Sequence, residues 1–202
     1  MIIDTNRDCT RHIEALKAAG VTTVIRYLNP LNASGEKCVK APEAHALAEA
    51  GIRLGLVNEG WGDFAHGGIS AGAGERDGGS SFAYAPSIGA AAGACIYFAV
   101  DADATAWQIR KLVLPYFQAL AQFKGQFKTG VYGSGAVCEA VTGAGLADYA
   151  WLSCSLGWLD SRAYLAANKW QLHQHLPHTV AGMDADGNDA NGDFGDFMPF
   201  AA

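Results

Sequence analysis

Several features that would place a chain outside the ordinary globular class are missing from this sequence. No run approaches the roughly 18 apolar residues needed to span a bilayer, so no membrane insertion is expected. Only six prolines accompany 25 glycines, and the glycines have no three-residue period, which excludes a collagen-like chain. Lysine and arginine form no cluster, and the net charge is -6 with a pI near 5.4. We therefore expect no nucleic-acid partner.

Cysteine pairs and a leader segment are also missing. The five cysteines form no CxxC pair and no zinc-ligand spacing, so we expect buried thiols instead of a disulfide framework. The first residues, Met1 to Asp4, lack the basic and apolar regions of a signal peptide. We expect a protein that stays in the cytoplasm of the producing cell until it is released.

What is present is the composition of a packed chain, with 50% hydrophobic and 17% charged residues over 202 positions. Short runs typical of strands alternate with segments of helical periodicity. The predicted strands are residues 1–5, 21–28, 52–58, 95–100, 128–132, 149–153, 169–173 and 180–183. The predicted helices are residues 11–19, 42–50, 80–92, 105–123, 136–141 and 161–166, with a kink or break at Pro115.

The number of strands predicts the architecture. Eight strands alternating with helices favour a parallel sheet, and eight is the number at which such a sheet closes into a barrel. An open doubly wound sheet is the alternative, because about 200 residues is the lower limit for a barrel. No GxGxxG follows the first strand to support its nucleotide-binding version. We predict an α/β fold, a compact and irregular single-domain (β/α)8 TIM-type barrel over residues 1–202, present as a monomer.

Acidic residues follow several of the predicted strands. Active sites of such barrels form at the carboxyl ends of the strands, where Asp4, Glu59, Asp101, Asp103 and Asp186 are expected. Asp101 and Asp103 are two residues apart, a spacing that puts both on one face of an extended strand. Several carboxylates from separate parts of the chain suit glycosidic bond hydrolysis, which needs a proton donor and a second carboxylate. A structural role for Asp103 as the cap of the following helix is about equally compatible with the sequence.

Aromatic residues near the strand ends suit a sugar site, because flat rings pack against the C–H face of a pyranose. They are Tyr27, Trp61, Tyr97, Tyr132, Trp151 and Trp158. Tyr97 and Trp151 could equally fill the barrel. Trp61 lies in a glycine-rich stretch, with eight of the 25 glycines between Gly60 and Gly79, which predicts a mobile loop at the mouth of the site. Arg26 could bind an acidic substrate group or form a structural ion pair.

Two segments invite a metal hypothesis that the sequence does not complete. His173 and His175 share one face of a predicted strand, but no acidic or cysteine motif accompanies them. The run from Asp184 to Asp193 is rich in Asp and Asn, but its glycine is at position four and no Glu is at position twelve. We predict no metal and no cofactor.

Four segments together resemble a known family. They are the first strand ending in Asp4, the block Ile96-Tyr97-Phe98-Ala99-Val100-Asp101-Ala102-Asp103, the run Thr129-Gly130-Val131-Tyr132-Gly133, and the pair Trp170-Gln171. The chain resembles the glycoside-hydrolase-like domains, once catalogued as of unknown function, that are related to the family 25 lysozymes. The resemblance implies a barrel that acts on peptidoglycan, with Asp4, Asp101, Asp103 and Asp186 at the acidic positions of the lysozyme site. Asp186-Gly187-Asn188 resembles the terminal Asp-x-Asn. The family 25 enzymes carry Asp-x-Glu where this chain has Asp101-Ala102-Asp103.

The resemblance implies a lysozyme-like hydrolase whose partner is the glycan strand of peptidoglycan. Asp103 is then the general acid, Asp101 supports the oxocarbenium charge, and Asp4 and Asp186 position water or the acetamido group. The predicted substrate-binding residues are Arg26, Glu59, Trp61, Tyr97, Tyr132, Trp151 and Gln171. This setting suits a small bacteriophage endolysin released through a holin. The alternative is a glycan-binding barrel with weak or lost activity, because Asp103 is one methylene shorter than Glu.

Overall fold

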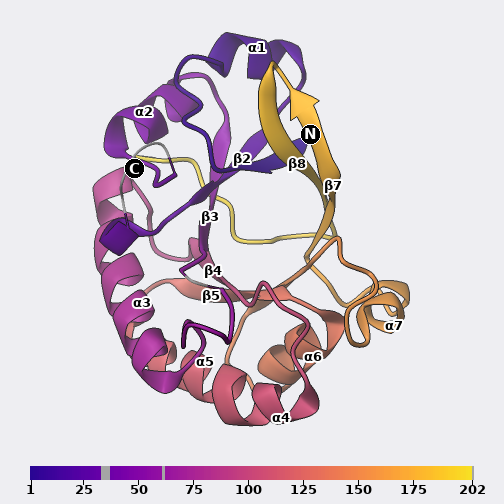
Figure 1. The fold of residues 1–202 in the computed structure, drawn as a ribbon. Helices are drawn as coiled ribbons and strands as arrows, with labels where there is room; N and C mark the ends of the chain where they lie inside the picture. The colour runs from indigo at the N-terminus through magenta and orange to yellow at the C-terminus, as the bar shows by residue number, and fades with distance from the viewer. Residues whose placement is uncertain (33–36, 61, 202) are drawn as a thin grey trace.

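The computed structural model describes residues 1–32, 37–60 and 62–201, which form a closed eight-stranded barrel surrounded by helices (Figure 1). The strands follow one another around the barrel in chain order. Their bounds are β1 Ile2–Thr5, β2 Thr23–Tyr27, β3 Arg53–Asn58, β4 Cys95–Ala99, β5 Lys128–Gly133, β6 Tyr149–Leu152, β7 Leu172–Val180 and β8 Met183–Ala190. The predicted TIM-type barrel is confirmed.

The helices lie in the connections between the strands. Their bounds are α1 Ile13–Ala18, α2 Ala41–Glu49, α3 Ala71–Tyr84, α4 Ala106–Gln108, α5 Leu114–Leu120, α6 Gly135–Gly143 and α7 Ser161–Ala166. Between α4 and α5 the chain forms a π-helical turn over Ile109–Val113, immediately before Pro115. The predicted break at Pro115 is therefore a local widening of the helix. Proline has no N–H to donate, and the wider turn accommodates the missing hydrogen bond. Among the described residues, no helix is long and apolar enough to cross a membrane.

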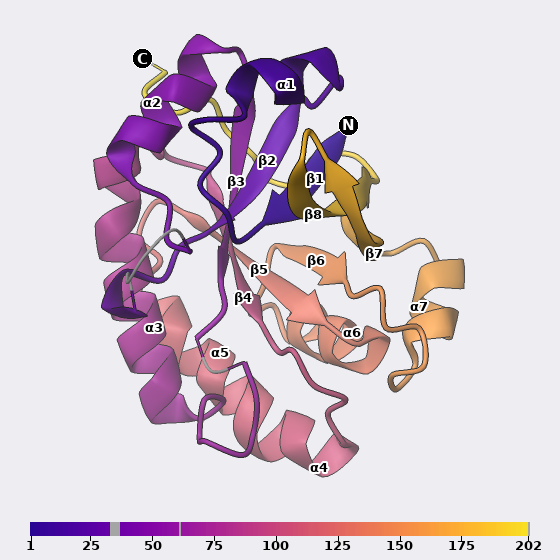
Figure 2. The same ribbon diagram turned by 45° about the horizontal axis from the view of Figure 1, so that its top comes forward.

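The last strand departs from the parallel pattern. Strands β1 to β7 pair in parallel, whereas β8 is antiparallel to both β7 and β1 and closes the barrel between them (Figure 2). Residues 180–183, predicted as the eighth strand, form the tip of this hairpin instead. Ala181 and Gly182 both have positive φ, at 53° and 76°, which matches the two-residue turn that antiparallel hairpins favour. Such turns usually carry Asn-Gly or Asp-Gly, so Ala-Gly gave little sequence signal.

Hydrophobic side chains fill two layers. The larger cluster lies between the outer faces of the strands and the helices. A second cluster fills the barrel interior and includes Tyr97, Tyr132, Trp151 and Phe194. This interior plug supports the floor of any site at the barrel mouth.

Candidate active site

A pocket of about 270 Å³ opens at the carboxyl ends of the parallel strands. This is the end of a (β/α)8 barrel at which active sites form. Its walls combine carboxylates, tyrosine and tryptophan rings, and small polar groups. The lining residues are Asp4, Tyr27, Val57, Glu59, Ala99, Asp101, Tyr132, Trp151, Cys154, Ser155, Gln174 and Asp186.

One wall of the pocket holds two carboxylates on neighbouring strands. Asp4 of β1 is paired with Asp186 of β8 in the antiparallel register. The Gln174 amide nitrogen lies 3.0 Å from Asp186 Oδ2 and 3.3 Å from both Asp4 oxygens, and it donates to both groups. The Asn188 amide donates to Asp4 Oδ2 at 2.7 Å. The two side-chain amides therefore hold the two carboxyl groups of this wall in place.

Asp4 is the most perturbed of these acids. Only 4% of the residue is exposed. Burial raises its pKa to about 7, the nearby Asp186 charge adds to the rise, and the hydrogen bonds from Asn188 and Gln174 oppose it. Burial also raises the pKa of Asp186. Near neutral pH, Asp4 can therefore hold a proton.

A second carboxylate pair, Glu59 and Asp101, contributes to the pocket lining. Glu59 follows β3, and its Oε2 lies 3.1 Å from the Lys37 ammonium. Burial and the Glu59 charge raise the pKa of Asp101, and Lys37 opposes the shift. Gly62 lies against both acids, because a Cβ on it would be 3.4 Å from Asp101 Cβ and 3.5 Å from Glu59 Cγ. The glycine-rich loop thus borders the acidic pocket at Gly62.

Aromatic rings complete the pocket. Tyr132 and Trp151 stack edge to face with centroids 4.9 Å apart, and the Tyr132 hydroxyl donates to Gln174 Oε1 at 2.8 Å. Tyr27 also lines the pocket, with the Lys37 ammonium 4.6 Å from its ring centroid. Rings beside carboxylates give a sugar both apolar area and polar partners.

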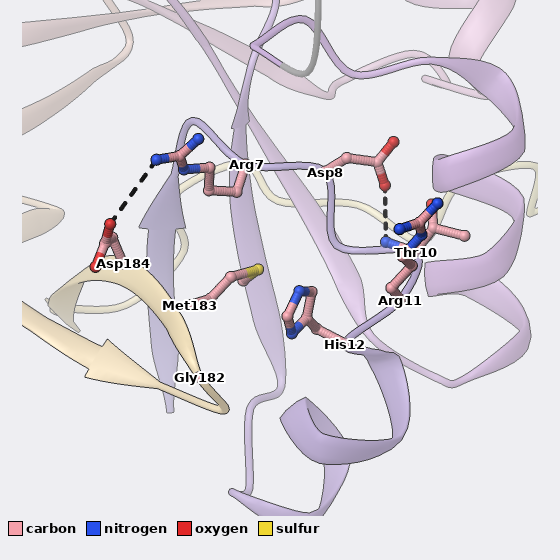
Figure 3. A pocket seen from close by; sticks show the side chains of 8 residues that line it. All are labelled: Arg7, Asp8, Thr10, Arg11, His12, Gly182, Met183 and Asp184. Atoms are coloured by element: carbon pink, nitrogen blue, oxygen red, sulfur yellow. Dashed lines mark hydrogen bonds and ion pairs between the residues drawn. The ribbon is translucent and has the colours of Figure 1, made fainter.

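A larger hollow of about 620 Å³ lies between the segment after β1 and the tip of the β7–β8 hairpin (Figure 3). Arg7 is 3.9 Å from Asp184 across it, and His12 Nδ1 lies 3.2 Å from the Ala181 carbonyl oxygen. The described residues that line it include no tyrosine, tryptophan or phenylalanine. The Arg7–Asp184 pair is exposed, so it contributes little energy. The smaller pocket has the acids and rings, and we take it as the candidate active site.

Comparison with known proteins identifies the family of this chain. The model of the Rv2525c-like, glycoside hydrolase-like domain family matches residues 14–192. The chain belongs to this family.

Among relatives of this Rv2525c-like chain, the uncharacterized protein YbfG of Bacillus subtilis (strain 168) is 28% identical over 194 residues. The match covers 86% of this chain but 26% of YbfG, so the chain spans about a quarter of that relative's length. The Tat-secreted protein Rv2525c of Mycobacterium tuberculosis, solved with L-tartrate, has a TM-score of 0.78 at 22% identity, covering 99% of this chain and 98% of that one. The autolysin LytC of Streptococcus pneumoniae, solved with a synthetic peptidoglycan ligand, has a TM-score of 0.57 at 14% identity, covering 93% and 46%. These two likenesses concern the fold.

The structure brings most of the predicted site residues of this Rv2525c-like domain together. The predicted residues that line the pocket are Asp4, Glu59, Asp101, Tyr132, Trp151 and Asp186. Trp61 lies outside the described residues. The remaining four are placed elsewhere, each for a physical reason.

Asp103 does not line the pocket. Strand β4 ends at Ala99, so Asp101 and Asp103 are not on one extended strand and do not share a face. Asp103 Oδ1 instead accepts a hydrogen bond from the Leu159 backbone amide at 2.8 Å. The capping residue of α4 is Thr105. Asp103 therefore ties two loops together.

Arg26, Tyr97 and Gln171 also lie outside the pocket lining. Arg26 is fully buried and donates to both Glu43 carboxylate oxygens, at 2.7 and 3.2 Å, so the structural ion pair is the correct alternative. Tyr97 lies inside the barrel, and its hydroxyl donates to the Phe194 carbonyl. Gln171 precedes β7 and accepts from the Ala150 backbone amide at 2.8 Å.

Sequence reasoning missed Gln174. It lines the pocket and contacts Asp4, Asp186 and Tyr132, but the predicted seventh strand ended at residue 173. Alternation offered a signal, because a strand that continued to 175 would have put Gln174 on the face opposite His173 and His175.

Proposed function

We propose that this domain hydrolyses glycosidic bonds in the glycan strands of peptidoglycan. One observation carries the proposal: Asp4 has a pKa of about 7 in a pocket that also contains Glu59 and Asp101. Glycosidases need a carboxylic acid that keeps its proton beside a carboxylate that does not. The family and the fold shared with LytC support the choice of substrate.

The pocket residues divide the reaction between them. Asp4 donates its proton to the leaving glycosidic oxygen as the C–O bond breaks. The carboxylates of Glu59 and Asp101 stabilise the positive charge that develops on the sugar ring. Water then adds to the anomeric carbon, and its proton returns to a pocket carboxylate, which completes hydrolysis. Tyr27 provides an apolar surface against which the sugar ring packs, above a pocket floor formed by the buried rings of Tyr132 and Trp151.

Digestion of purified peptidoglycan, followed by mass spectrometry of the new reducing ends, tests this function. We expect wild type to release such ends, and Asp4→Asn and Asp101→Asn to lower the rate about 100-fold or more. Asp103→Asn is the matched control and should stay within a few fold, because Asp103 bonds to Leu159 outside the pocket. The rate should fall as the pH rises through about 7, where Asp4 loses its proton.

The second candidate is a glycan-binding barrel without turnover. The position of Asp103 favours it, because the residue that replaces the expected Glu is held away from the pocket. Wild type that releases no more ends than Asp4→Asn contradicts hydrolysis. Retention on insoluble peptidoglycan by that same protein, lost in Tyr27→Ala, would then identify the binding module.

A further inference from the structure

The outer face of the β7–β8 hairpin carries a side-chain cluster that the proposed reaction does not use. His173, His175 and Asp189 each offer a ligand atom, and these atoms all lie within 4.8 Å of one another. His173 is paired with Asp189 across the two strands, and His175 is two residues along on the same face. Asp189 belongs to the next strand, β8. The sequence around the two histidines therefore gives no sign of their acidic partner.

The contacts within this cluster are those of a preformed ligand set. His175 Nε2 lies 2.9 Å from Asp189 Oδ2, and the two histidine ring centroids are 5.0 Å apart. The Nε2 atom of His173 is buried and has no hydrogen-bond partner in the described part of the chain. Opposite His175 the facing strand has Gly187, where a Cβ would lie 3.9 Å from His175 Cβ. The absence of a side chain at Gly187 leaves room for the rings of His175 and His178, since a Cβ there would also lie 3.0 Å from His178 Cε1.

We propose that His173, His175 and Asp189 bind a divalent first-row transition-metal ion such as Zn²⁺ or Ni²⁺. Imidazole nitrogens and a carboxylate oxygen are ligands that these ions accept. Ligand atoms each about 2.0–2.2 Å from such an ion can be up to about 4.4 Å apart, so small side-chain rotations complete the site. His175 and Asp189 side chains are 44% and 67% exposed, which leaves room for solvent at the remaining coordination positions.

The ion would act as a clamp on the hairpin. His173 and His175 flank Gln174, whose side chain points the other way, into the pocket, and holds Asp4 and Asp186. A β-bulge follows between Gln174 and Pro177, where the pairing register shifts. Coordination of His173, His175 and Asp189 to one ion would fix the strand at Gln174. The importance of this clamp for the pocket rests on the proposed function, whereas binding of the ion does not.

Calorimetric titration of the chain, made without a polyhistidine tag, with ZnCl2 and NiCl2 tests the site. We expect one ion per chain with micromolar affinity, and at least a tenfold loss of affinity in His175→Ala and in Asp189→Asn. His178→Ala is the matched control, because it removes an exposed histidine of the same hairpin that is outside the cluster. Equal affinity in wild type and His175→Ala, or an equal loss in His178→Ala, overturns the proposal.

Two further measurements separate this site from the glycosidase proposal. At about 100 times the dissociation constant, the ion should raise the melting temperature by roughly 5 to 10 °C, and this rise should vanish in His175→Ala. Backbone hydrogen exchange at residues 172–176 should slow on metal addition, and unchanged exchange contradicts the clamp. Neither readout involves a glycan, so each stands or fails independently of hydrolysis.

Discussion

Asp4 combines almost complete burial with a second acid directly opposite on the neighbouring strand. Charges of like sign placed opposite each other destabilise a strand pair, so holding one proton relieves the repulsion. The Asp4 carboxyl group, which we propose as the proton donor, therefore destabilises the folded state once it ionises. This conflict at a single residue is measurable as a pH dependence of stability.

Replacement of Asp4 by Asn should remove that pH dependence. The pKa of Asp4 is about 7 in the folded chain and near 3.8 in the unfolded chain. Its contribution to stability is therefore fully present below pH 3.8 and is lost as the pH rises through about 7. Between pH 4 and pH 8, the free energy of unfolding of Asp4→Asn should rise relative to wild type by up to about 4 kcal/mol. Urea denaturation across this range measures the difference.

The control for this prediction is Asp184→Asn, which removes an 83% exposed carboxylate of the neighbouring strand β8. Its difference from wild type should change by less than about 0.5 kcal/mol over the same range. A constant difference between Asp4→Asn and wild type would show that Asp4 is ionised throughout.

At the scale of elements, half of the glycine-rich segment that the sequence predicts to be a loop forms the start of helix α3. Its N-cap is Ser70, whose hydroxyl accepts from the Ala73 amide at 3.3 Å, and four of the eight glycines between Gly60 and Gly79 lie within the helix. Gly74 and Gly78 face α5, where an added Cβ would collide with the Tyr116 carbonyl and with Leu120. These glycines allow the two helices to pack backbone against backbone.

Alanine substitutions in α3 should therefore have opposite effects at two positions. A Cβ at Gly78 would lie 2.9 Å from Leu120 Cα, so Gly78→Ala should destabilise the fold by about 1–3 kcal/mol. At Gly72 nothing lies within 4 Å, so Gly72→Ala should stabilise it by about 0.4–1 kcal/mol. Thermal unfolding of both variants provides the comparison. Stabilisation by both substitutions would mean that the close packing of α3 on α5 is incorrect.

The sequence could predict elements whose residues repeat with a clear period. The buried strands β2 to β5 and the connection through Pro115 follow from local patterns, as does the placement of Asp4, Glu59 and Asp101 at strand ends. The β7–β8 hairpin could not be predicted, because its Ala181-Gly182 turn lacks the usual residues and its strands carry histidines and acids in place of apolar side chains. Local patterns therefore place Gln174 and Asp186 outside strands, although their positions in β7 and β8 bring them together.

On the scale of the whole molecule, the segment after β8 closes the barrel at the end opposite the pocket. Phe197 and Leu54, near the start of β3, exchange two backbone hydrogen bonds as an antiparallel bridge. The Phe194 carbonyl accepts a hydrogen bond from the Tyr97 hydroxyl inside the barrel. Asp196 accepts hydrogen bonds from Thr23 and Arg53 on two neighbouring strands. This segment ties the amino ends of several strands together.

Removal of the Phe197 ring should therefore cost far more than removal of the Phe200 ring. Phe197 is 7% exposed, and Phe197→Ala should lower the free energy of unfolding by about 3–5 kcal/mol. Phe200 is 41% exposed and stacks on His45, so Phe200→Ala should cost about 1 kcal/mol. Chemical denaturation of the two variants tests this. Similar losses would indicate that the segment does not seal the barrel.

The barrel end opposite the pocket, which the segment after β8 closes, also determines how the domain could be attached to a surface. Met1 lies beside Thr22 at the start of β2, and Phe200 lies beside Gly89 before β4, so both chain ends are opposite the pocket. A bead, a sensor chip or a fused reporter joined at either end would leave the pocket facing outward. The immobilised domain could then be exposed to intact cell-wall fragments, which are too large to diffuse into a porous support.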